Sequence, residues 1–69
     1  MKITEIKTLV ERQPFRPFVI ETTGGKQILI SQQRNILLPE AKPELVIAFT
    51  DDGQMHLVED EAIASVASS

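Results

Sequence analysis

The five residues from Pro14 to Phe18 constrain the fold of this chain more than any other segment. The run Pro-Phe-Arg-Pro-Phe holds two of the three Phe and two of the four Pro in a chain of 69 residues. Proline cannot extend a helix, and it moves the residue before it out of the α region. We therefore expect a helix to end near Gln13 and strands to begin at Pro17.

The segment before this run has the pattern of an amphipathic helix. Ile3, Ile6, Leu9 and Val10 recur at spacings of three and four, which places them on one helical face. We expect a helix over about residues 4–12 with Thr4 as its N-cap. So short a helix must pack against another element to be stable.

Residues 17–31 have the alternation of a β-hairpin broken by Gly24-Gly25. A two-residue Gly-Gly loop would place Glu21 opposite Ile28. A three-residue loop over 23–25 places Ile20 opposite Ile28 and gathers the apolar residues on one face. We prefer the second register, which also gives Gly25 the left-handed position of the bulge.

Residues 45–58 predict a second hairpin around Asp51-Asp52-Gly53. A three-residue loop gives the pairs Phe49–Met55, Ile47–Leu57 and Ala48–His56. We expect Phe49 to join Phe15 and Phe18 in the core, and His56 to lie on the polar face beside Ala48.

The remaining segments give weaker patterns. Residues 36–38 predict a short strand, and residues 59–61 predict a turn or a single helical turn. The spacing of three between Ile63 and Val66 fits a helical turn better than a strand. We predict a single α+β domain over residues 1–69, with an N-terminal helix packed on a small curled, mainly antiparallel sheet or a partly closed five-stranded barrel.

Size and composition indicate the kind of protein. So small a domain is marginally stable, and with no Cys it has no disulfide to reinforce it, so we expect self-association. No segment approaches the ~20 apolar residues that cross a bilayer. Lys2, Glu5 and Lys7 rule out a signal peptide at the N-terminus, so we expect a cytoplasmic protein with no membrane partner.

Candidate catalytic and metal-binding residues are few. His56 is the only histidine, with Asp51, Asp52 and Glu59 close in sequence. A metal site with one His and no Cys lacks ligands, and no acid–base constellation activates a Ser or Thr. We therefore expect no catalytic residue, no metal site and no cofactor.

A nucleic-acid site would rely on Arg16, Lys26 and Arg34. Residues 1–34 carry six Lys and Arg against three Asp and Glu, whereas residues 35–69 carry one against seven. The whole chain is acidic, with a pI near 4.9, and its few aromatic residues are needed in the core. We do not expect nucleic acid to be the main partner.

Two resemblances follow from these residues. The helix, then Gln13-Pro14-Phe15-Arg16-Pro17-Phe18, then a turn glycine and a meander, resembles a group of small bacterial proteins with a P-F-x-P-F motif. That resemblance implies a fold and no activity. The chain is more loosely similar to Sm-like RNA-binding barrels, but Gln33-Arg34-Asn35-Ile36 departs from their Asp-x-x-x-Asn loop and Asp51-Asp52-Gly53 replaces their Arg-Gly loop.

These observations together predict a non-catalytic interaction module that self-associates through sheet edges or the helix face. A homo-oligomer is the expected assembly, with a further protein partner possible. The alternative is an Sm-like binder of single-stranded nucleic acid.

Overall fold

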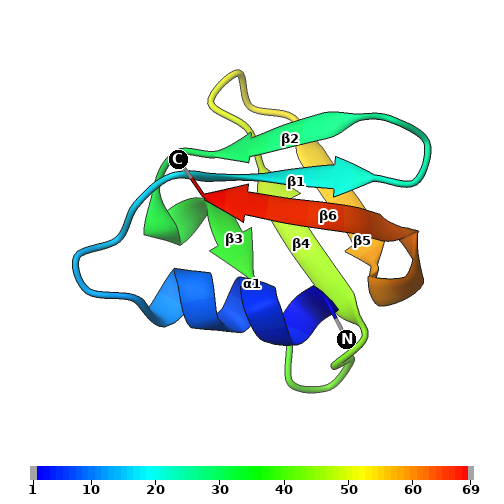
Figure 1. Ribbon diagram of the computed structural model, residues 1–69, viewed down its shortest axis with the longest axis horizontal. Helices are drawn as coiled ribbons and strands as arrows, with labels where there is room; N and C mark the ends of the chain where they lie inside the picture. Colours follow the sequence, from blue (N-terminus) through cyan, green and yellow to red (C-terminus); the bar gives the residue numbers. More distant parts are fainter. Residues whose placement is uncertain (1, 69) are drawn as a thin grey trace.

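One helix and six strands form in residues 2–68, the part of the chain that the computed structural model describes (Figure 1). In chain order the elements are α1 (Lys2–Glu11), β1 (Phe18–Thr22), β2 (Gln27–Ile30), the 3-10 turn η1 (Gln33–Asn35), β3 (Ile36–Leu37), β4 (Leu45–Phe49), β5 (Met55–Glu59), the 3-10 turn η2 (Asp60–Ala62) and β6 (Ile63–Ser68).

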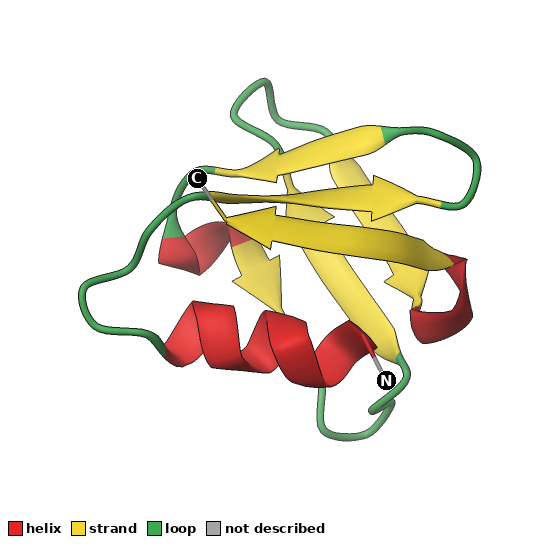
Figure 2. Cartoon of the chain, in the orientation of Figure 1, coloured by secondary structure: helices red, strands yellow, loops and turns green. Residues whose placement is uncertain are grey.

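The strands form two antiparallel sheets of three strands each. The orders are β2-β1-β6 and β3-β4-β5, and α1 packs beside β6 and η2 (Figures 1 and 2). The predicted α+β class, a helix packed on small antiparallel sheets, is therefore confirmed. The sheets do not close, so the five-stranded barrel does not form.

The core lies where α1 and the two sheets meet. Phe18 is fully buried, and the half-buried ring of Phe15 packs edge-on against it with ring centroids 6.0 Å apart. The Pro-Phe run thus joins helix to sheet, as its sequence indicates, and the Gln13–Pro14 peptide bond within this passage is cis. The other buried side chains are Ile3, Ile6, Ile20, Ile28, Ile30, Ile36, Val46, Ala48, Val58 and Ile63.

The first hairpin has the register that the sequence predicts. Ile20 pairs with Ile28 and Glu21 with Gln27, and the Thr22 amide donates to the Lys26 carbonyl at 2.8 Å. Gly25 has a φ of 90°, the left-handed value that its place in the loop requires.

The second hairpin also has the predicted register, but its faces are reversed. Phe49 pairs with Met55 and Ala48 with His56, as expected. Ala48 is fully buried, however, whereas Phe49 is half-buried on the outward side. The predictions of Phe49 in the core and of His56 on the polar face are therefore wrong. β4 is apolar at all five positions, so alternation alone could not select its inner face.

The final segment is a strand and not the helical turn that its spacing predicts. β6 pairs with β1, and its register shifts between Glu21 and Thr22. Ser65 pairs with Glu21 and Ile63 with Thr22, which leaves Ala64 as the extra residue of a β-bulge. Residues three apart in a regular strand point to opposite faces, as Ile63 and Val66 would. The bulge allows Ile63 to point inward, where it is buried.

The helix begins two residues earlier than predicted, and its cap comes from another element. Thr4 lies inside the first turn, where its carbonyl accepts a hydrogen bond from the Thr8 hydroxyl at 3.1 Å. The Ile3 amide donates instead to Asp60 Oδ1 at 2.9 Å. The predicted Thr4 cap is wrong because η2 supplies a carboxylate at the helix N-terminus.

Candidate interaction surface

The outward side of the β3-β4-β5 sheet is apolar. We call this surface the outer face, and it is formed by Leu37, Leu45, Ile47, Phe49, Met55 and Leu57. Leu37, Met55 and Leu57 are 52%, 59% and 62% exposed, and they are three of the four large hydrophobic side chains left exposed in the described residues. A single exposed hydrophobic residue is ordinary, but such a group on one sheet face makes this surface a candidate for interaction.

Strand pairing brings these side chains together. Ile47 pairs with Leu37 on one side and with Leu57 on the other, so one residue from each strand forms a continuous apolar row. Phe49 and Met55 form a second pair two residues along the same face.

The composition of β4 explains why an apolar face is left uncovered. Its sequence LVIAF places Val46 and Ala48 inward, and the alternate residues also are apolar. Strands with apolar residues on both sides are typical of sheets covered on both faces. Among the described strand residues on this side of the sheet, Glu59 is the only charged one, and it pairs with Leu45 at one end.

The other sheet has a different outward side. Leu29 is 51% exposed on β2 and pairs with the half-buried Val19, and the next pair on that side is Gln27 with Glu21. Glu21 Oε1 accepts a hydrogen bond from Ser65 Oγ at 3.3 Å. Leu29 is therefore the one large hydrophobic side chain left exposed among the described residues of this sheet, in a row with Val19 and Ala67 that polar residues flank, and it gives a matched comparison for Leu57.

The three residues proposed for nucleic acid do not form one patch. Phe18 at the start of β1 pairs with Ile30 at the end of β2, so Arg16 and Arg34 belong to the same end of this sheet. Lys26 lies in the loop at the opposite end of β1 (Figure 1).

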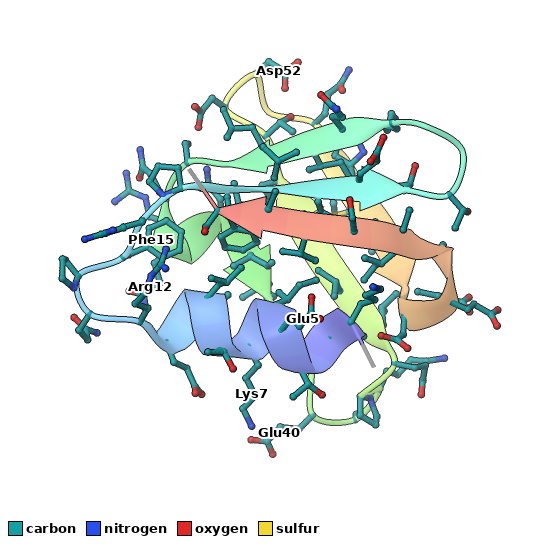
Figure 3. All side chains as sticks on the ribbon, viewed as in Figure 1. Glu5, Lys7, Arg12, Phe15, Glu40 and Asp52 are labelled. Atoms are coloured by element: carbon teal, nitrogen blue, oxygen red, sulfur yellow. The ribbon has the colours of Figure 1, made fainter. Side chains whose placement is uncertain are left out.

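Arg12 lies near the same end as Arg16 and Arg34. Figure 3 shows its side chain extending from the end of α1 toward Phe15. Its Nε and Nη2 atoms are buried without a hydrogen-bond acceptor among the described residues. The Gln33 side-chain amide, close by, donates to the Val10 carbonyl at 2.7 Å and so caps the end of the helix.

The acidic residues near His56 hold the hairpin loop. Asp51 Oδ1 accepts hydrogen bonds from Ser31 Oγ at 2.7 Å and from Asn35 Nδ2 at 3.2 Å. Asp52, at the tip of the loop in Figure 3, accepts a hydrogen bond from the Thr50 hydroxyl, and this bond lowers the pKa of the Asp52 carboxyl. No group of three or more His, Cys, Asp or Glu that could hold a metal ion occurs within residues 2–68.

A shallow groove of about 700 Å³ runs between α1 and the segment that joins β3 to β4. Ile3, Val10, Leu38 and Leu45 supply its apolar lining. Figure 3 shows Lys7 and Glu40 pointing toward one another across it. The groove therefore has both a basic and an acidic residue, and its charge favours neither an anionic nor a cationic ligand.

The comparisons with known proteins show the fold alone. No family model matches the chain, and no curated protein matches it. An X-ray structure of a Northeast Structural Genomics Consortium target is similar, with a TM-score of 0.57 and 15% sequence identity, over 77% of this chain and 89% of that one. No helix in residues 2–68 is long and apolar enough to span a membrane.

Sequence reasoning missed the outer face, although a signal was present. The two strands of the second hairpin hold more apolar residues than one buried face can use. Assigning Phe49 to the core concealed that excess.

Proposed function

We propose that this chain is a non-catalytic interaction module that self-associates through its outer face. The observation that carries the proposal is the apolar row Leu37–Ile47–Leu57, which is half-exposed at both ends and continuous across three strands. The helix face, one of the surfaces expected from the sequence, is less suitable because the exposed positions of α1 are polar. Of the sheet edges, the other surface expected from the sequence, β3 has only two residues, whereas β2, β5 and β6 have four to six. We prefer the outer face because its exposed side chains are apolar.

The expected strength of this contact is modest. Full burial of a Leu or Met side chain is worth about 1.5–3 kcal/mol, so the exposed halves of Leu37, Met55 and Leu57 supply about 1 kcal/mol or slightly more each. Association costs at least ~4 kcal/mol in lost translational and rotational freedom. The half-buried members of the face must also contribute, and we expect a complex that dissociates on dilution.

The non-catalytic part of the proposal rests on how the polar side chains are used. Asp51 holds η1 to the β4–β5 loop, Asp52 stabilises that loop, and Asp60 caps α1. Each of these carboxylates has a local structural task. As part of the same proposal we place the module in the cytoplasm.

Light scattering over a dilution series tests the proposal. We expect the mean mass of the wild type to rise with concentration, and we expect Leu57→Glu to abolish the rise because it places a charge in the apolar row. Leu29→Glu, a matched change on the other sheet, should behave as the wild type. A wild-type protein that is monomeric throughout the micromolar range would refute self-association.

A further inference from the structure

We propose that the occupant of the outer face is the same face of a second copy, related to the first by a two-fold axis near Ile47. The two β3-β4-β5 sheets then pack face to face as the inner layers of a sandwich. This inference rests on the proposed function and specifies its geometry. It is carried by the symmetry of the apolar row, by the position of the only charge and by the size of the face.

The apolar row is suited to contact with itself. Ile47 lies at its centre on β4, with one Leu on each side at the neighbouring strands. A two-fold axis that passes over Ile47 in the plane between the sheets, nearly along or nearly perpendicular to β4, places the row of one copy against the row of the other. An isologous contact of this kind is the commonest symmetry of small homo-oligomers.

The charge on this side of the sheet is compatible with that arrangement. Glu59 lies two residues beyond Leu57 on β5, at the margin of the face. With the axis at Ile47 and sheets about 10 Å apart, the two Glu59 residues lie roughly 10 Å apart or farther, at the rim where water screens them. None of the six described residues of the outer face is basic, so the face has no charge that would select an acidic partner instead.

The size of the face also matches a second copy. Two strands of five residues and a third of two, about 4.8 Å apart and about 3.4 Å per residue, span at most roughly 14 by 17 Å. This footprint is well below the ~800 Å² per partner of a standard stable complex. A larger permanent partner would need contacts beyond this sheet, whereas a second copy of the sheet covers it fully and forms a weak dimer. Twisted sheets pack in this way with their strands about 30° apart.

Cysteine cross-linking tests the geometry, because the chain has no Cys of its own. Leu57→Cys and Leu29→Cys are matched, since both replace a leucine that is more than half-exposed on a strand. With a thiol cross-linker that spans about 10 Å, the spacing of packed sheets, we expect Leu57→Cys to give covalent dimers at concentrations where the wild type associates. Leu29→Cys should give only the background of random collision.

The outcomes separate this inference from the proposed function. A wild type that associates, with Leu57→Cys cross-linking no better than Leu29→Cys, overturns the face-to-face geometry and leaves self-association standing. A wild type that stays monomeric overturns both.

Circular dichroism of each Cys variant first establishes that it retains the wild-type fold, and Met55 oxidation gives a second readout without substitution. Burial of Met55 in the dimer should slow its oxidation by peroxide several-fold as the protein concentration rises, and an unchanged rate in the associated protein contradicts the inference.

Discussion

Phe18 is the residue on which the core depends most, because it is the largest of the fully buried side chains. It opens β1 directly after Pro17, and it contacts the ring of Phe15 from the connecting segment. Its side chain therefore links the passage between helix and sheet to the interior of the protein.

Truncation of this side chain should be severe. We expect Phe18→Ala to lower the free energy of unfolding by about 3–5 kcal/mol, through lost burial and the cavity left behind. In so small a domain that loss can abolish folding. Urea unfolding followed by circular dichroism measures it, with Phe15→Ala as the milder comparison because Phe15 is only half-buried. Equal stability of Phe18→Ala and the wild type would show that the core is assigned wrongly.

Thr50 and Asp52 give a second prediction at the residue scale. The Thr50 hydroxyl lowers the pKa of the Asp52 carboxyl, with a smaller contribution from the Gln54 amide. A lowered folded-state pKa contributes stability above the unfolded-state pKa, and this contribution is lost as the pH falls through the folded-state value. We expect Thr50→Val to raise the Asp52 pKa toward its ordinary value in an NMR titration. An unchanged pKa would mean that the hydroxyl does not stabilise the carboxylate.

At the scale of elements, the two hairpins use the same loop geometry. Gly25 and Gly53 have φ values of 90° and 89°, and each follows two loop residues in a three-residue connection. An L side chain at such a φ is strained even where space is open, and no atom lies within 4 Å of a Cβ at either position.

The two neighbouring glycines of the first loop, Gly24 and Gly25, allow a matched test of the left-handed position. We expect Gly25→Ala to destabilise the protein by about 1–2 kcal/mol because alanine resists the left-handed conformation. Gly24→Ala should be close to neutral, since its Cβ would meet only the Thr22 hydroxyl at an ordinary 3.9 Å. Thermal unfolding of the two variants compares them directly, and similar losses for both would contradict the loop assignment.

The elements also show how far the sequence alone could predict this fold. The β1–β2 register was predictable because Glu21 and Gln27 make only one face apolar. The inner face of β4 was not, because both of its faces are apolar. The bulge in β6 and the cap that Asp60 gives to α1 each depend on a partner distant in sequence, and no local pattern encodes such a partner.

The same limit applies to the candidate sites. The sequence correctly singled out Asp51 and Asp52 as loop residues, but it could not show that Lys26 lies at the opposite end of β1 from Arg16. The arrangement of the strands decides which charged side chains lie close together, and the composition of the chain does not contain that arrangement. The outer face, by contrast, was present in the sequence as an excess of apolar residues in the second hairpin.

At the scale of the whole molecule, one sheet has an outward side of mixed polarity and the other has an apolar one. The outward side of the β2-β1-β6 sheet carries polar residues such as Glu21 and Ser65, whereas the β3-β4-β5 sheet leaves Leu37 and Leu57 exposed to water. A domain of this size has few apolar side chains to spare, and the uncovered apolar row is the observation on which the proposed self-association rests.

A dilution series of amide NMR spectra tests this central claim most directly. We predict that the signals which move with concentration belong to the outer face, at residues 37, 45, 47, 49, 55 and 57, and that Leu29 and the exposed side of α1 stay unchanged. The movement should disappear in Leu57→Glu. Signals that do not move at all, or that move along β6 and α1 while the outer face stays constant, would contradict the account.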